Sequence, residues 1–350
     1  MSKNNITIND VAKAAGVSKA TVSRYLNGKT ELMTKETSER IENVIELLNY
    51  RPSEVARSLK SRKTKTIGVI LADIRSPFYA ALLSGIEEKL IERDYSAIFV
   101  NSGKSHDTEL KNVTSFLSRN VDGILINTTS FNNEELIAMT ANRIPMVLID
   151  RYINNHNFSV VTIDNEKMFD LIFDHLQSEG YNRFAFIVGQ WKSNSTRIKR
   201  RNLFLKNMKD RFGVDAENDV YAIHTDFPTY GDGVDAFLSS LKAGDRPCII
   251  GSNSDATFSV YHALIERGIK IPEEVGIIGP EDWSLGRDMA WPDVMATPLT
   301  TIAFDSVGIG RKAAELIIER IEHPENELKE IKMPVELYIR ESTKGTGIKK

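Results

Sequence analysis

The sequence has a single cysteine, Cys248, which excludes an internal disulfide bond and fits a reducing, cytoplasmic environment. No hydrophobic run approaches the length that crosses a membrane, and the polar start, MSKNNITIND, does not resemble a signal peptide. The six histidines are scattered without the spacing of metal ligands, so we expect neither a metal site nor a cofactor. At 350 residues with 41% hydrophobic side chains, the chain is long enough for more than one domain.

Charge is distributed unevenly along the chain. Residues 1–65 contain 8 Lys and 5 Arg against 7 Asp and Glu, whereas the whole chain has a net charge of −3. A basic head is therefore followed by an acidic body of about −9. This asymmetry is typical of a protein that contacts phosphates at one end only.

The stretch NDVAKAAGVSKATVSRYLNG, residues 9–28, predicts two short helices joined by a tight turn. Val11 lies on the inner face of the first helix, and Gly16 provides the permissive backbone that ends it. Ser18 is suited to begin the second helix, in which Val22 faces the first. This is the pattern of a helix-turn-helix, in which the second helix enters the major groove of DNA. An ordinary corner between two core helices is the alternative.

The residues that follow complete a small helical bundle. Thr34 is a plausible N-cap of a third helix, whose apolar positions recur with helical spacing at Ile41, Val44, Ile45 and Leu48. Pro52 suits the first turn of a fourth helix, PSEVARSL, which precedes the charged connector KSRKTKT. With these flanks, the sequence resembles the lactose-repressor family of bacterial transcription regulators. The matching stretches are NDVAKAAGVSKATVSRYLNG, LNYRPSEVARSL and TKTIGVI, and the resemblance extends from Ile6 to about Thr343.

The resemblance implies a symmetric dimer that binds a pseudo-palindromic operator. Lys19, Ala20 and Arg24 match the positions that read bases; Arg and Lys suit guanine, and Ala20 suits a thymine methyl. Ala56 and Leu59 match hinge-helix residues that enter the minor groove, with packing against the partner as an alternative role for Leu59. The polar residues suited to phosphate contacts are Thr7, Ser18, Thr21, Ser23 and Asn27.

From residue 66 the sequence alternates apolar strands with amphipathic helices. One series runs from TIGVILA to PMVLIDR and a second from SVVTIDN to VGIIGP, which predicts an α/β core of two doubly wound parallel-sheet subdomains. Such a core resembles periplasmic binding proteins, and its ligand is expected in the cleft between the lobes. The expected boundaries are a helix-turn-helix head at 1–60 with a hinge helix at about 52–60, a linker at 61–66, and a core at 67–345. Within the core, we expect a first lobe of 67–163 plus 296–324 and a second lobe of 164–295 plus 325–345.

Ligand-binding residues in the first lobe are inferred from matches to the family pattern. Phe78 and Tyr79 match an aromatic loop after the first strand, with helix-to-sheet packing as the alternative. Asp150 and Arg151 end the strand in PMVLIDR, where a carboxylate can accept hydrogen bonds from sugar hydroxyls.

In the second lobe, Arg200 stands at the place of a ligand-clamping arginine and Arg197 lies one turn earlier, although Leu203 replaces the usual glycine. A solvated basic helix face is the alternative for part of this run. Phe227 matches a position where an aromatic ring stacks on the ligand. The remaining candidates, which depart from the family pattern, are Asn253, Ser254, Asp255, Glu281 and Trp283.

These departures place the usual carboxylate in doubt and favour an anionic ligand, such as a sugar acid or sugar phosphate. The resemblance implies a repressor of carbohydrate-metabolism genes that is controlled by a sugar or sugar derivative. Two alternatives stay open: a two-lobed solute-binding protein and an α/β enzyme core with an accessory DNA-binding head. The enzyme lacks support in the sequence, because no glycine-rich phosphate loop or nucleophile elbow follows a strand and GIGRKA at 308–313 is too short for the dinucleotide pattern.

Overall fold

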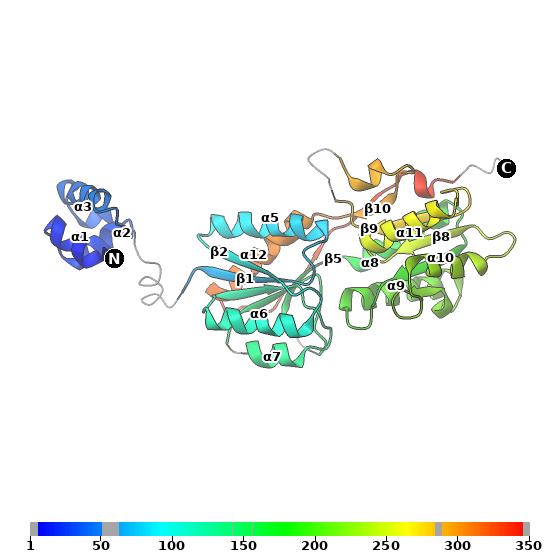
Figure 1. Ribbon diagram of the computed structural model, residues 1–350, viewed down its shortest axis with the longest axis horizontal. Coiled ribbons are helices and arrows are strands. Elements are labelled where there is room, and N and C mark those ends of the chain that lie inside the picture. Colours follow the sequence, from blue (N-terminus) through cyan, green and yellow to red (C-terminus); the bar gives the residue numbers. More distant parts are fainter. Residues whose placement is uncertain (1–5, 51–62, 142, 156, 284–288, 346–350) are drawn as a thin grey trace. The chain divides into compact units, whose positions relative to one another are not determined.

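A computed structural model describes residues 6–50, 63–141, 143–155, 157–283 and 289–345 of the chain. Contacts divide the protein into two compact units, with the boundary between Lys65 and Thr66 (Figure 1). The first unit is the helical head and the second is the α/β core. Each is described by itself.

The described part of the head consists of helices α1 (Ile8–Ala15), α2 (Lys19–Leu26) and α3 (Lys35–Leu47), with a 3-10 turn, η1 (Thr30–Leu32). Gly16 ends α1 with a left-handed backbone, φ +63°, and Ser18 caps α2 by accepting a hydrogen bond from the backbone N–H of Thr21. Val11, Val22 and Ile41 are fully buried where the three helices meet. The predicted tri-helical bundle is therefore present; the predicted hinge helix, with Pro52, lies outside the described residues.

The first lobe of the core is built on a parallel sheet in the order β11-β5-β4-β3-β1-β2. Its strands are β1 (Thr66–Leu71), β2 (Ser96–Asn101), β3 (Gly123–Ile126), β4 (Met146–Ile149), β5 (Ser159–Ile163) and β11 (Glu330–Met333). Its helices are α5 (Pro77–Glu92), α6 (His106–Ser118), α7 (Glu134–Thr140) and α12 (Ser306–Glu322).

Helices α5 and α12 pack backbone against backbone on one side of this sheet (Figure 1). Gly85 and Gly310 permit the close approach. A Cβ on Gly85 would lie 2.0 Å from the carbonyl oxygen of Val307, and one on Gly310 would lie 2.1 Å from that of Leu82. The pair brings a late segment of the chain into the first lobe.

The second lobe is built on a mostly parallel sheet in the order β12-β10-β9-β8-β6-β7, in which β12 pairs antiparallel with β10. Its strands are β6 (Arg183–Val188), β7 (Val220–Ala222), β8 (Pro247–Gly251), β9 (Gly276–Pro280), β10 (Thr300–Ala303) and β12 (Glu336–Tyr338). Its helices are α8 (Asn165–Ser178), α9 (Ser195–Phe212), α10 (Tyr230–Ser239) and α11 (Ser254–Glu266), with 3-10 turns η2 (Glu217–Asp219), η3 (Trp291–Val294) and η4 (Glu341–Thr343). The predicted fold class is confirmed.

Two of the expected lobe limits are corrected by the strand pairing. We assigned 296–324 to the first lobe, but β10 pairs with β9 in the second sheet. We assigned 325–345 to the second lobe, but β11 pairs with β5 in the first sheet. β11 is an edge strand, whereas β10 lies between β9 and β12; both are short, and backbone hydrogen bonds carry no local sequence signal that identifies the sheet a strand joins.

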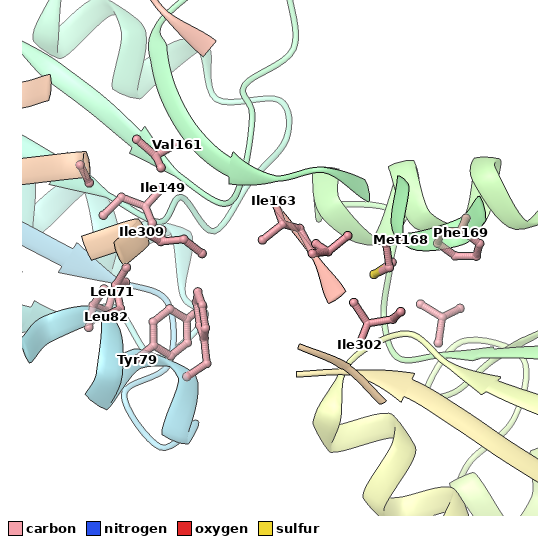
Figure 2. Packing of buried hydrophobic residues seen from close by; sticks show 14 of the residues in the cluster. Leu71, Tyr79, Leu82, Ile149, Val161, Ile163, Met168, Phe169, Ile302 and Ile309 are labelled. Atoms are coloured by element: carbon pink, nitrogen blue, oxygen red, sulfur yellow. The ribbon is translucent and has the colours of Figure 1, made fainter. Parts of the chain in front are cut away.

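One cluster of buried hydrophobic residues continues through both lobes (Figure 2). Leu82 and Val161 belong to its first-lobe part, whereas Phe169 and Ile302 belong to the second. Ile163 ends β5, just before the chain passes into α8. The connections between the lobes are therefore packed into the core, and the polar ends of the strands are left to line the space between the lobes.

Candidate DNA-binding surface and effector cavity

Helix α2 presents the residues predicted to read bases on one solvent-facing surface. Lys19, Ala20 and Arg24 are all exposed, whereas Val22 on the opposite side is fully buried. This is the arrangement that a recognition helix needs, because the buried side fixes the helix while the exposed side is free to enter a groove. The role of the three residues in reading bases stays a prediction.

The residues predicted to contact phosphates surround this helix and are at least partly accessible. Thr7 donates to Asp10 at the start of α1, Ser18 and Thr21 share a hydrogen bond of 2.8 Å, and Asn27 donates to the carbonyl of Ser23. These contacts order the helix ends and hold the hydroxyl groups at the surface. Ala56 and Leu59, predicted to enter the minor groove, lie outside the described residues.

The core contains a cavity of about 700 Å³ between its two lobes. Its size is that of a site for a small ligand. All the predicted ligand residues except Phe227 line it: Phe78, Tyr79, Asp150, Arg151, Arg197, Arg200, Asn253, Ser254, Asp255, Glu281 and Trp283. The sheets bring them together because most follow the carboxyl ends of parallel strands, which meet at the same edge.

Phe227 is a correction to the sequence analysis, because it is absent from the cavity wall. The turn after β7 folds back on itself, with His224 N–H donating to the carbonyl oxygen of Phe227 at 2.7 Å. The ring of Phe227 consequently packs on Tyr221, with 5.6 Å between the ring centroids. Its aromatic character serves the second-lobe core.

The first-lobe wall centres on Asp150, which directly follows β4 and has a left-handed backbone, φ +64°. Such a conformation is unfavourable for a residue with a Cβ and is found at binding sites held by surrounding contacts. Thr196 of the second lobe donates through Oγ1 to the backbone oxygen of Asp150 at 2.9 Å. Beside it, Tyr79 donates to Asn127 Oδ1 at 2.7 Å, and burial raises the pKa of Tyr79 to about 12. The tyrosine is therefore a neutral wall residue.

The second-lobe wall begins on α9, which Asn194 caps by accepting from the N–H of Arg197. Arg200 is only 4% exposed; its Nε donates to Asn165 Oδ1 at 3.0 Å and its Nη1 to the carbonyl of Ser252 at 2.6 Å. These two bonds fix its guanidinium at the cavity wall. The predicted alternative of a solvated basic face does not hold for Arg200.

Glu281 supplies a carboxylate directly after β9, again with a left-handed backbone, φ +77°. Ser254, the first residue of α11, donates through Oγ to its carboxylate. Burial raises the pKa of Glu281, while the charge of Arg200 opposes this shift. The sequence left the usual carboxylate in doubt; at this position the structure has one, and the hydroxyl of Ser254 donates to it.

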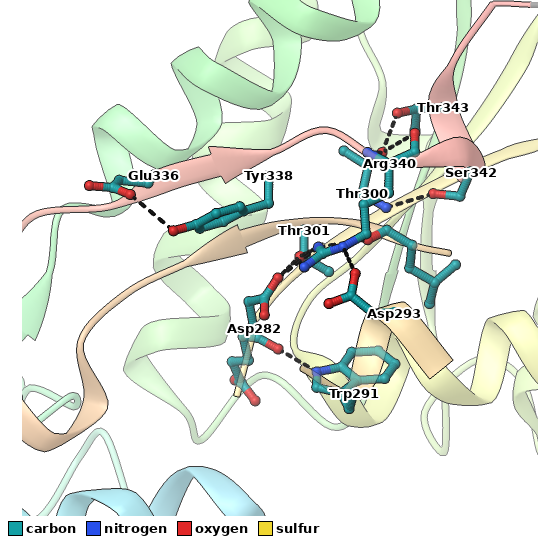
Figure 3. A network of polar contacts seen from close by, with 12 residues as sticks. Asp282, Trp291, Asp293, Thr300, Thr301, Glu336, Tyr338, Arg340, Ser342 and Thr343 are labelled. Atoms are coloured by element: carbon teal, nitrogen blue, oxygen red, sulfur yellow. Dashed lines mark hydrogen bonds and ion pairs between the residues drawn. The ribbon is translucent and has the colours of Figure 1, made fainter. Parts of the chain in front are cut away.

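Aromatic side chains that sequence analysis missed complete the wall. Trp291 stacks on Trp283 with 5.6 Å between ring centroids. Its Nε1 donates to the backbone oxygen of Glu281 at 2.7 Å, the dashed line drawn from Trp291 in Figure 3. Phe258 and Phe304 also line the cavity. In the sequence, the only sign that Trp291 belongs to the site is its aromatic residue type in WPDV. Its contact is with Glu281, ten residues earlier at the end of a strand, and no local pattern predicts such a contact.

The cavity also includes a salt-bridged group on the first lobe. Asp73 pairs with Arg75 at 2.8 Å and with Lys104 at 3.1 Å. The hydrogen bond from Arg75, followed by that from Lys104, holds the pKa of Asp73 well below its usual range. These two cations already have a carboxylate partner.

The described residues contain no cluster of three or more His, Cys, Asp or Glu side chains arranged to hold a metal ion. No helix in the described part of the chain is both long and apolar enough to cross a membrane.

Comparison with known families covers both units. Residues 7–53 match the family described as "Bacterial regulatory proteins, lacI family". Residues 64–341 match the family described as "Periplasmic binding proteins and sugar binding domain of LacI family".

Curated relatives match over nearly the whole length. The HTH-type transcriptional regulator PtxS of Pseudomonas aeruginosa is 32% identical over 346 residues, which cover 99% of this chain and 98% of that protein. The HTH-type transcriptional regulator KdgR of Bacillus subtilis is 31% identical over 339 residues, covering 96% and 97%. Both relatives are transcriptional regulators.

Among solved structures, the lac repressor dimer bound to operator and the anti-inducer ONPF superimposes with a TM-score of 0.81 at 20% identity, covering 98% of this chain and all of that chain. This likeness shows the fold. Together with the family matches to both units, it identifies the chain as a member of the lacI family of bacterial regulatory proteins, a DNA-binding transcriptional regulator whose core is a sugar-binding domain of that family.

Proposed function

We propose that this protein is a homodimeric repressor that binds a pseudo-palindromic operator, with an affinity set by a sugar or sugar derivative in the cavity between the lobes. The observation that carries the proposal is the composition of the cavity wall. Tyr79 and Asp150 come from the first lobe, and Arg200 and Glu281 from the second. A ligand that contacts both sets favours one relative position of the lobes over others, which is the differential affinity that a switch requires.

The contacts between the lobes give this switch a physical basis. Tyr152 N–H donates to Ser195 Oγ at 2.7 Å, and Phe131 N–H donates to the carbonyl of Ser193 at 2.7 Å. Thr196 Oγ1 likewise donates to the backbone oxygen of Asp150 at 2.9 Å, so these contacts lie beside the cavity and a ligand bound there adds to them. The change in operator affinity and the change in ligand affinity must be equal by linkage.

The proposed DNA contacts follow from the surface of α2. Lys19 and Arg24 present donors to guanine edges, and Ala20 presents a methyl group to thymine. The phosphate-contacting residues fix the register. The basic charge of residues 1–65 adds a non-specific attraction that weakens with salt.

We further propose that the core binds its ligand without chemical conversion. The relatives named above are transcriptional regulators, which supports this proposal. The hydroxyl of Ser254, which donates to the carboxylate of Glu281, is the arrangement that the enzyme alternative would use. Incubating the full chain with each ligand that it binds, and analysing the ligand by NMR, checks this proposal. Conversion of a bound sugar at a catalytic rate would support the enzyme alternative instead.

The central test is an operator titration. A high-affinity duplex is first selected from random DNA with the full chain, and binding is then measured by fluorescence anisotropy with and without each of a panel of sugars, sugar acids and sugar phosphates. We expect at least one ligand to change operator affinity several-fold. A chain lacking residues 1–60 should bind that ligand but not the duplex. Operator binding by the truncated chain would contradict the role assigned to the head.

A further inference from the structure

The cavity holds three arginines that have no carboxylate partner among the described residues. Arg151, Arg197 and Arg200 all line it, and no described Asp or Glu oxygen lies within 4.0 Å of their guanidinium nitrogens. The cations beside Asp73 differ in this respect, because that carboxylate pairs with both Arg75 and Lys104. A partly buried guanidinium without a counter-ion is costly unless another group neutralises it.

Neutral oxygens use only part of the donor capacity of Arg151 and Arg197. Arg151 Nη1 donates to the carbonyl of Thr128 at 2.7 Å, and Arg197 Nη1 donates to that of Gln190 at 2.7 Å. The Nε of Arg151 is buried and has no hydrogen-bond acceptor in the described part of the chain. A guanidinium presents five N–H donors, so both side chains retain donors for a ligand.

A second donor in the wall is also unsatisfied. Trp283 Nε1 is buried without an acceptor among the described residues, although its ring stacks on Trp291. Buried donors without partners are uncommon in proteins and call for an explanation. A ligand rich in oxygen acceptors, bound in this cavity, supplies one.

The nearby carboxylates are occupied by hydroxyl groups. Asp150 Oδ2 accepts from Thr196, Glu281 accepts from Ser254, and Asp255 is hydrogen-bonded to Tyr230. Burial, and next the charge of Arg151, lower the pKa of Arg197, which places two like charges within reach of each other. An anion placed between these two guanidinium groups would relieve their mutual repulsion.

We propose that the effector carries an anionic group, a carboxylate or a phosphate monoester, that binds between Arg151 and Arg197. This inference rests on the proposed function and names the chemical class of its ligand. Guanidinium groups bind carboxylates and phosphates through paired N–H donors, which makes both anions suitable. The sugar part of the effector reaches Asp150 with its hydroxyls and packs on Trp283.

The test uses pairs of probes with the same carbon skeleton, one of which carries an anionic group. The full chain is titrated calorimetrically, and its thermal unfolding is followed, with gluconate, galactonate and xylonate and with the open-chain alcohols glucitol, galactitol and xylitol as their neutral partners. A second arm uses glucose 6-phosphate and galactose 6-phosphate, with glucose and galactose as neutral partners. We expect at least one acid or phosphate to bind at least tenfold more tightly than its neutral partner. The acids and the phosphates form separate arms, so the result also identifies which anion is used.

Substitutions then locate the anion. Arg151→Gln and Arg197→Gln should each lower the affinity for the preferred anion by about 10- to 100-fold, because each substitution removes a charge-assisted hydrogen bond. Arg151→Lys keeps the charge but loses Nε, and should retain part of the preference. Arg201→Gln is the matched control, since Arg201 lies on the same helix as Arg197 but pairs with Glu217 outside the cavity wall. Unfolding of each variant without ligand shows whether it folds.

Three results would overturn the inference. These are equal or tighter binding of the neutral partners, unchanged anion binding in both Gln variants, and no binding by any acid or phosphate of the panel. If the ligand that changes operator affinity is a neutral sugar, the inference of an anionic effector is wrong, whereas the proposed regulatory function still holds. If the full chain selects and binds no operator duplex, the proposed function itself is contradicted.

Discussion

Arg340, close to the C-terminal end of the described chain, forms an ion pair of 2.7 Å with Asp282, the residue between Glu281 and Trp283 in the cavity wall (Figure 3). The side chains of Asp282 and Arg340 are 7% and 13% exposed. Thr301 donates to the same carboxylate at 2.5 Å. A residue outside the cavity therefore fixes the backbone that places two cavity residues.

We expect Arg340→Leu to lower the free energy of unfolding by about 3 kcal/mol, because removing one member of a buried pair leaves the other charge without a partner. The double variant with Asp282→Asn and Arg340→Leu should lose less free energy of unfolding than the sum of the losses in the two single variants. Urea denaturation measures all three variants. Additive losses would show that the pair does not act as a unit.

Packing of α5 on α12 gives a second prediction. Gly310→Ala should destabilise the core by about 1–3 kcal/mol or more, since the new methyl group would overlap the backbone carbonyl of Leu82. Lys312→Ala on the exposed side of the same helix is the control, with an expected change within about 0.5 kcal/mol. Thermal unfolding of both proteins compares them. Equal stability of the two variants would contradict the close approach.

Buried His175 predicts a pH dependence of stability. Its Nε2 lies 2.7 Å from Thr343 Oγ1, and burial lowers its pKa, against the opposing charge of Glu179. The unfolded chain therefore binds a proton more readily than the folded chain, so stability falls as the pH drops below about 6.5. His175→Gln should show a smaller fall in urea denaturation between pH 7 and pH 5. An identical pH profile for both proteins would exclude this contribution.

The recognition surface predicts a change in base specificity. Arg24→Ala should cost about 1–3 kcal/mol of operator binding and relax the preference at one base pair in each half-site. Arg40→Ala, an exposed arginine on α3, should leave the base preference intact. Binding to a set of singly substituted operators, at fixed salt concentration, distinguishes the two. A uniform loss across all operators would assign Arg24 to phosphate contact.

Local signals in the sequence determined the ends of the head helices and the alternation of strands and helices in the core. Gly16 and Ser18 mark their helix ends through contacts with residues a few positions away, and this is why such signals can be read directly. The resemblance to the lacI family then predicted ligand residues that, except for Phe227, line the cavity, and their roles in binding stay predictions. Phe227 lies outside the cavity wall because the chain folds back on itself in the turn after β7, and the neighbouring residue types do not predict this turn.

The tertiary structure alone decided the partners that are distant in the chain. It selected the sheets that β10 and β11 extend, brought Trp291 onto Trp283, and joined Arg340 to Asp282 across 58 positions of sequence. Such contacts depend on backbone edges and packed surfaces that exist only after the sheets have formed. The sequence contained every charge in the cavity, but only the fold determined that Asp73 pairs with Arg75 and Lys104 while Arg151 and Arg197 form no ion pair with a described carboxylate.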